Sequence, residues 1–264
     1  MIVRDSRPPA VAGMFYPEDT NQLREEVRDY MSATPVYEAL GTPRALIVPH
    51  AGYPYSGPVA GTAFRLLAET GKEISRVVLL GPSHHLSFEG LAYSGFEAFR
   101  TPLGTVPVDS EAIDRIRSLP QVQLLEGAHF REHCLEVELP FLQMALQDFR
   151  IVPLVVGSAT PEQVAEVIHL LWDAHSLVLV STDLSHYLDY ETAQALDAET
   201  CRRIKDLDFV HIGPADACGA RALNGLLCEA DKQGLTVHTL DLRNSGDTAG
   251  DRSRVVGYGA WSLD

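Results

Sequence analysis

The sequence predicts an α/β fold, with one domain over residues 1–264 and a central, mostly parallel sheet that has helices on both faces. Three observations support this prediction. Short, continuous apolar runs alternate with helical segments, which is typical of sheets buried on both faces. No linker rich in Gly, Ser or Pro divides the chain, and no internal repeat is visible. A length of 264 residues suits one large α/β domain.

The elements follow from local patterns. Helices are expected where charged and apolar residues recur with a helical period, over 20–33, 59–69, 109–119, 134–147, 161–174, 190–205 and 214–232. Thr160 lies in the expected N-cap of one of them, and Pro161 suits its first position. Buried strands are expected at the apolar runs 45–49, 76–81, 150–157 and 176–182. Residues 103–108, 236–242 and 254–261 are expected to add strands, some of them antiparallel.

Charge and composition exclude several classes of protein. Lys and Arg total 21 against 36 Asp and Glu, a net charge of −15, which argues against general nucleic-acid binding and against docking on an anionic membrane. No apolar run approaches the roughly 18–20 residues of a membrane span. The N-terminal residues lack the apolar stretch of a secretory signal, and four cysteines make no disulfide framework. We therefore expect a cytoplasmic protein.

Polar side chains gather where three of the predicted strands end. His50 follows the first strand, His84 and His85 follow the second, and Asp183 and His186 follow the fourth. Because loops beyond the carboxyl ends of strands meet in one crevice of an open α/β sheet, these side chains are expected to converge. The 34 residues from His50 to His84 leave room for one crossover helix, so these two histidines are expected at the ends of neighbouring parallel strands. Adjacent residues of an extended loop point in opposite directions, so only one of the two consecutive histidines is expected to enter the site directly.

Two of the cysteines lie in segments that also carry polar or charged residues. Cys134 lies in the segment EHCLEVELP at 132–140, where helical spacing places it on one face with Glu138. Cys218 precedes an apolar helix, and a helix N-terminus with a neighbouring metal would favour its thiolate. Glu132 and His133 form a weaker acid–base candidate, with solvent exposure an equal alternative. The sequence contains no signature of a dinucleotide-binding, P-loop, α/β-hydrolase or zincin site.

Seven segments follow one another along the chain: RPPAVAGMFYP at 7–17, PHAGYPYSG at 49–57, GPSHH at 81–85, EHCLEVELP at 132–140, STDLSH at 181–186, CG at 218–219 and SGDTAGDRSRVVGYGA at 245–260. In this order they resemble the Memo-like family, whose fold is related to that of the class III extradiol ring-cleavage dioxygenases. Each one alone is weak evidence, whereas the ordered set is specific and covers nearly the whole chain.

The resemblance implies a metal site held by His50, His84 and Cys218, with Asp183 and His186 lining the same pocket and His186 as the acid–base residue. A thiolate would replace the carboxylate of the related dioxygenases, and such a soft ligand favours copper(I) or zinc. The implied cofactor is therefore a metal ion, with iron(II) or copper favoured and zinc as an alternative. The resemblance also implies a pathway association with an AMMECR-type protein and a radical S-adenosylmethionine enzyme.

These inferences lead to competing hypotheses of function. The first is a metal-dependent redox enzyme, using iron or copper, that acts on an unknown small-molecule or modified substrate. The second is a non-catalytic scaffold that retains the dioxygenase-like pocket and binds a metal or a peptide. The third is a hydrolase, either with zinc or without metal, in which Asp183 and His186 activate water.

Overall fold

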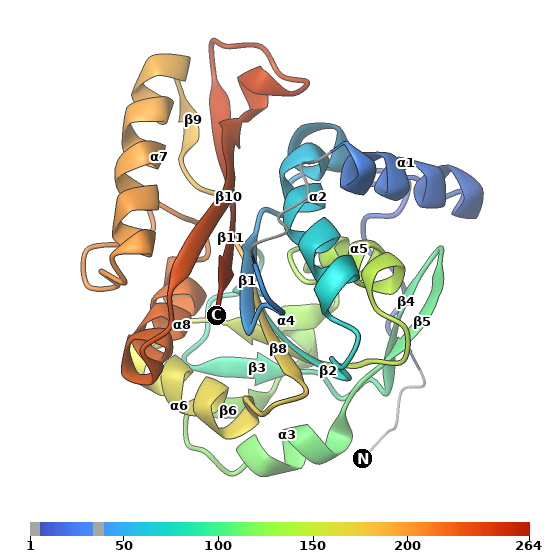
Figure 1. The fold of residues 1–264 in the computed structure, drawn as a ribbon. Coiled ribbons are helices and arrows are strands. Elements are labelled where there is room, and N and C mark those ends of the chain that lie inside the picture. Colours follow the sequence, from blue (N-terminus) through green and yellow to red (C-terminus); the bar gives the residue numbers. More distant parts are fainter. Residues whose placement is uncertain (1–5, 34–39) are drawn as a thin grey trace.

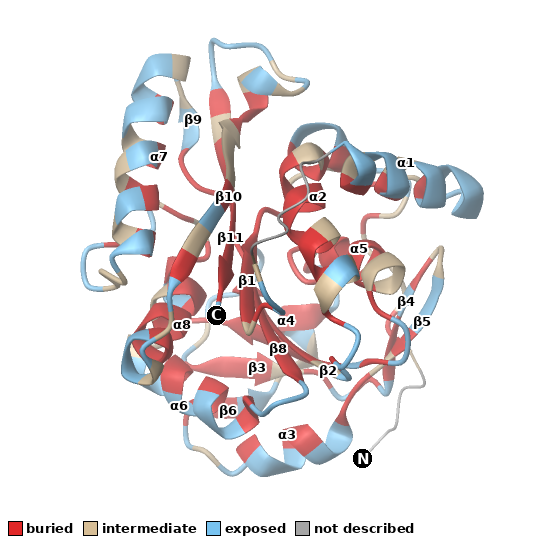
Figure 2. Ribbon diagram, in the orientation of Figure 1, coloured by how far each residue is buried: buried red, intermediate tan, exposed pale blue. Residues whose placement is uncertain are grey.

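Four parallel strands form the centre of the sheet, in the order β1, β8, β2 and β7 (Figure 1). The computed structural model describes residues 6–33 and 40–264. The bounds of the four strands are Ala45–Val48 for β1, Ser176–Ser181 for β8, Arg76–Pro82 for β2 and Arg150–Val156 for β7. Nearly every residue of these strands is buried (Figure 2), as expected for a sheet covered on both faces.

Antiparallel strands extend the sheet on both sides. Beside β1, β11 (Val255–Leu263) lies between β1 and β10 (Val237–Asn244), and β9 (His186–Leu188) pairs with one end of β11. Beside β7, β3 (Leu91–Tyr93) is antiparallel and is followed by β6 (Val122–Leu124). A separate hairpin joins β4 and β5, with bounds Ala98–Thr101 and Gly104–Pro107. The sheet is therefore mixed overall, with the predicted parallel strands at its centre.

Helices cover both faces of the sheet, as the sequence predicts. One layer contains α1, α2 and α5, which pack on one another and, through α2, on β1 and β11. The opposite layer contains α3, α6 and α8, with α8 against β2 and β8 (Figure 1). The bounds of these six are Thr20–Ser32, Tyr53–Thr70 and Leu139–Ala145 for the first layer, and Ser110–Ile116, Pro161–Leu171 and Ala220–Gln233 for the second. Helix α7 (Tyr190–Lys205) packs on β10 and β11.

Helix boundaries differ from the predictions where proline or a loop intervenes. The segment predicted as one helix over 134–147 contains a 3₁₀ turn, Glu136–Glu138, followed by α5. Pro140 lies in the first turn of α5, where its missing N–H costs no hydrogen bond, so a new helix begins there. Short elements at Glu126–His129 (α4) and Ser245–Asp247 were not predicted. Within the described residues, no helix combines the length and apolar character needed to cross a membrane.

Candidate metal centre

Three parallel strands end close together at one edge of the sheet. The chain continues from β1 to His50, from β2 to His84 and from β8 to Asp183. The spacing of the two histidines suggested neighbouring strands, and that expectation is wrong, because β8 lies between β1 and β2. The two imidazole rings nevertheless approach each other, with centroids 5.1 Å apart. The carboxyl edge of the sheet thus brings residues from three segments together.

His50 is almost fully buried and is held on both sides of its ring. Its backbone N–H donates to Asp183 Oδ1 at 2.8 Å, and its Nδ1 lies 2.8 Å from Ser181 Oγ. Its other ring nitrogen, Nε2, lies 3.3 Å from Cys218 Sγ. Burial, together with the neighbouring charge of His84, lowers the pKa of His50 to about 3. The imidazole is therefore neutral at pH 7, as a metal ligand must be.

His84 is held by a buried carboxylate. Glu132 accepts from the His84 backbone N–H at 2.7 Å, and its other oxygen lies 2.8 Å from His84 Nδ1. Burial opposes charge on both groups, but the hydrogen bonds and charges of the pair outweigh it. They raise the pKa of His84 and lower the pKa of Glu132 to about 2. This contact orients the His84 ring and leaves Nε2 for another partner.

His133 completes a group of three histidines. Its ring stacks on His84 with centroids 4.6 Å apart, and lies 5.5 Å from the ring of His50. Ligand nitrogens of the three side chains all lie within 4.8 Å of one another. Burial lowers the pKa of His133 to about 3. The sequence suggests His133 only as an acid–base partner of Glu132, with solvent exposure of the two side chains an equal alternative. The structure instead buries Glu132 and places His133 in the cluster.

Cys218 reaches the cluster from the loop before α8. Besides His50, its sulfur accepts from the Asp183 backbone N–H at 3.3 Å. Burial, reinforced by the charge of Asp183, raises the pKa of the thiol to about 12. The N-terminus of α8 therefore does not by itself hold a thiolate, and only a neighbouring cation would lower that pKa.

Asp183 and His186 lie on the same loop but make separate contacts. The Asp183 carboxylate is directed at the His50 backbone, and burial raises the pKa of Asp183 to about 6. His186 is exposed, and its Nδ1 lies 2.7 Å from the Leu184 carbonyl oxygen. Asp183 thus positions the loop of His50, whereas the backbone orients His186.

Cys134 and His85 lie beside the cluster. The Cys134 thiol is buried, donates to the Pro82 carbonyl at 3.1 Å, and has a pKa raised well above its usual range by burial. The Cys134 sulfur packs directly against Gly81. A side chain at position 81 would collide with it, because a Cβ there would lie 2.6 Å from Cys134 Sγ. His85 is exposed. Although Cys134 Sγ lies within 4.8 Å of ligand atoms of His84 and Glu132, its packing and raised pKa favour a structural role.

The loop after β8 is anchored by a buried acid from α7. The Ser185 backbone N–H donates to Asp197 Oδ1 at 3.0 Å, and Asp197 is 3% exposed. Burial raises the pKa of Asp197 from 3.8 to about 6, although the hydrogen bond from Ser185 opposes this shift. The folded state therefore binds a proton more tightly than the unfolded chain does. Stability conferred by the protonated acid is fully present below pH 4 and is lost as the pH rises to about 6.

Asp197→Asn should remove this dependence, because the amide oxygen keeps the hydrogen bond and does not titrate. In urea unfolding from pH 4 to 8, we expect the variant to gain stability relative to the parent up to about pH 6 and then level off. The pKa difference limits the gain to about 3 kcal/mol. Asp189→Asn at the N-cap of α7 is the control: the Thr192 N–H lowers the pKa of Asp189 below its usual 3.8, so this acid is ionised in both the folded and the unfolded state above about pH 5, and its effect on stability should not change with pH there. A pH-independent difference for Asp197→Asn would contradict the assignment.

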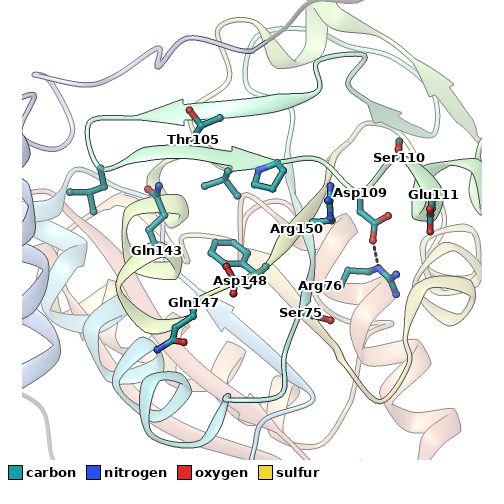
Figure 3. A pocket seen from close by; sticks show the side chains of 14 residues that line it. Ser75, Arg76, Thr105, Asp109, Ser110, Glu111, Gln143, Gln147, Asp148 and Arg150 are labelled. Atoms are coloured by element: carbon teal, nitrogen blue, oxygen red, sulfur yellow. Dashed lines mark hydrogen bonds and ion pairs between the residues drawn. The ribbon is translucent and has the colours of Figure 1, made fainter.

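Two cavities differ in their relation to this cluster. A cavity of about 410 Å³ has His84, His85, Cys218 and Arg221 among its lining residues, so it gives access to the cluster. A larger one, of about 880 Å³, is lined at the amino ends of β2 and β7 by Arg76 and Arg150 and contains none of the predicted site residues. There the guanidinium of Arg76 is already paired with a carboxylate (Figure 3). The smaller cavity is therefore the candidate substrate site.

The donor set suits a transition metal. Neutral imidazole nitrogens and a thiol are ligands that iron, copper and zinc accept, whereas calcium and magnesium prefer oxygen. The described residues thus form an α/β protein with a candidate metal centre at the carboxyl edge of its sheet.

The comparisons place this chain in a family. The family profile described as Memo-like protein matches residues 7–262. MEMO1 family proteins of Methanopyrus kandleri and Metallosphaera sedula are 36% and 34% identical to it, each over 96% of this chain and 97% of the relative. The chain belongs to the Memo-like family. The crystal structure of an uncharacterized protein, JW3007 from Escherichia coli K12, is similar in fold alone, with a TM-score of 0.53 and 13% identity over 81% of this chain and 98% of that one.

Proposed function

We propose that this protein is a metal-dependent redox enzyme that binds iron or copper and acts on an unknown small-molecule or modified substrate. The observation that carries the proposal is the convergence of His50 and His84 with Cys218 and His133 beside a cavity of about 410 Å³. His50, His84 and Cys218 are the proposed ligands, and His133 is the alternative third ligand. Three protein ligands leave positions free, as catalytic sites require.

The proposed roles of the remaining residues concern protons. A bound iron or copper ion would supply redox chemistry and a place for the substrate to bind. Asp183, whose buried carboxylate accepts from the His50 backbone N–H, is the proposed positioning residue for the group whose proton is transferred. His186 is the proposed general acid–base residue, because it is exposed on the loop that also carries Asp183. Zinc with a water-activating pair remains the hydrolase alternative.

We also propose a cytoplasmic location and a shared pathway with AMMECR-type and radical S-adenosylmethionine proteins. The location is supported by the four cysteines, all of which are free, as is usual in a reducing compartment. The pathway is supported by family membership alone.

Anaerobic titration with iron(II), copper(I) and zinc(II) tests the proposal. The parent should bind about one ion per chain, and Cys218→Ser should weaken copper(I) binding at least ~10-fold, since thiolates are the soft ligands that copper(I) prefers. His133→Ala should have the smaller effect. The reverse order would make His133 the third ligand, and a parent that binds none of the three ions would refute the proposal. Metal binding without oxygen consumption after a reductant is added would favour the scaffold.

A further inference from the structure

The segment EHCLEVELP at 132–140 places three acidic side chains inside the protein. Glu132, Glu136 and Glu138 are at most 2% exposed. Glu132 contacts His84, as described above. Glu136 forms an ion pair with Arg7 at 2.6 Å. Among the described residues no cation forms an ion pair with Glu138, whose carboxyl group lies 2.9 Å from Ser181 Oγ, so its role requires another explanation.

The Ser181 hydroxyl is shared among three groups. Its oxygen lies 2.7 Å from the Cys134 carbonyl oxygen, 2.8 Å from His50 Nδ1 and 2.9 Å from Glu138 Oε1. A hydroxyl has one proton to donate and two lone pairs that accept. Because a carbonyl only accepts, the hydroxyl proton belongs to the shortest contact, the one with Cys134. The oxygen then accepts from the other two groups, so His50 must carry its proton on Nδ1.

Glu138 fits this arrangement as a carboxylic acid. Burial, with the charge of Asp183 adding to it, raises the pKa of Glu138 well above its usual range. The acid form donates to Ser181 Oγ and leaves the hydroxyl proton directed at Cys134. The network is therefore fully satisfied, as buried polar groups require.

We propose that Ser181 and Glu138 are positioning residues that hold His50 as the tautomer protonated on Nδ1. This tautomer leaves the lone pair of Nε2 directed toward Cys218, at 3.3 Å, where the metal would bind. The inference rests on the proposed metal site and deepens it. It assigns the same role to hydrogen bonding on both histidines, since Glu132 fixes Nδ1 of His84 and Ser181 fixes Nδ1 of His50.

Iron(II) and zinc(II) affinities, measured anaerobically, test the proposal in four variants. Ser181→Ala and Glu138→Met should each weaken binding by about 10–100-fold, the usual effect of losing a hydrogen-bond partner of a ligand. Glu138→Gln should stay within about 3-fold of the parent, because its amide N–H can donate to Ser181. Ser176→Ala is the matched control, since Ser176 also lies in β8 and is buried at the opposite end of the strand. Its affinity should equal that of the parent.

A second measurement needs no metal. In histidine-selective ¹⁵N NMR of the metal-free protein, His50 should be protonated on Nδ1 in the parent and should shift toward the Nε2 tautomer in Ser181→Ala. Parent-like affinity and tautomer in Ser181→Ala would overturn the proposal and leave the metal site intact. Equal losses in Glu138→Gln and Glu138→Met would overturn the role of Glu138. If the parent binds neither ion, the proposed function fails, while the tautomer still tests the positioning roles.

Discussion

His50→Ala and His84→Ala should each abolish stoichiometric metal binding while the protein stays folded. Each substitution removes a ligand nitrogen from a cluster whose members lie within 4.8 Å of one another. The loss should exceed the about 10–100-fold that removal of a ligand's hydrogen-bond partner costs. Metal content after anaerobic loading and desalting measures it, with far-ultraviolet circular dichroism as the check on folding.

Two histidine variants serve as controls for this prediction. His85→Ala removes the exposed neighbour of His84 and should keep most of the metal. His186→Ala should keep its metal and lose turnover, because a general acid–base residue typically contributes about 10²–10⁴-fold to a rate. Metal loss in His186→Ala would make His186 a ligand. Parent-like metal content in both His50→Ala and His84→Ala would show that the ion binds elsewhere.

Glu136→Ala should destabilise the protein by about 3–5 kcal/mol, the usual cost of leaving one partner of a buried ion pair uncompensated. Arg7 is 1% exposed, and its charge would remain inside the protein. Glu136 also accepts from the backbone N–H groups of Ala10 and Val11 and from the Tyr16 hydroxyl. One side chain thus attaches the segment at 7–16 to the cluster-bearing segment at 132–140. Urea unfolding at pH 7 measures the loss.

Glu69→Ala is the matched control for this loss. Glu69 pairs with Arg65 one helical turn away on α2, and both side chains are 32% exposed. Exposed pairs at this spacing are worth about 0.3–0.5 kcal/mol, so the two variants should differ by several-fold. If Glu136→Ala does not fold, Glu136→Gln keeps part of the hydrogen bonding and supplies a measurable intermediate value. A loss below about 1 kcal/mol in Glu136→Ala would contradict the interpretation.

The central strands could be predicted because each is a continuous apolar run followed by a polar loop. The order of these strands in the sheet could not be predicted, because the local pattern of apolar residues carries no information on which parallel strand lies between two others. That order goes with contacts between segments far apart in the sequence, since α8 packs on β2 and β8. The short strands β3, β6 and β9 escaped prediction because three residues are too few to establish an alternating pattern.

The predicted site residues came from the ends of strands, where polar side chains stand out against apolar runs. His133 and Glu138 gave no such signal, since they lie in a charged segment that has the appearance of a solvated helix. Their burial depends on partners far away in the sequence, which are Ser181 for Glu138 and His84 for His133. A segment with three glutamates separated by apolar residues is the only hint that the sequence offered. The sequence alone therefore does not predict which of these charged side chains are buried.

Because β8 lies between β1 and β2, the spacing of the candidate centre is set by the strands, whereas its chemistry is set by the donor side chains. Neighbouring strands of a sheet lie about 4.8 Å apart, so the loops that carry His50 and His84 start from points fixed by backbone spacing. The positions from which these loops start, which we call the frame of the site, are thus independent of the chemistry of the donor side chains. A change such as Cys218→Glu would exchange a soft donor for a hard one and favour iron(II) without altering the frame. In this arrangement the donor at position 218 can be exchanged while β1, β8 and β2 keep their spacing.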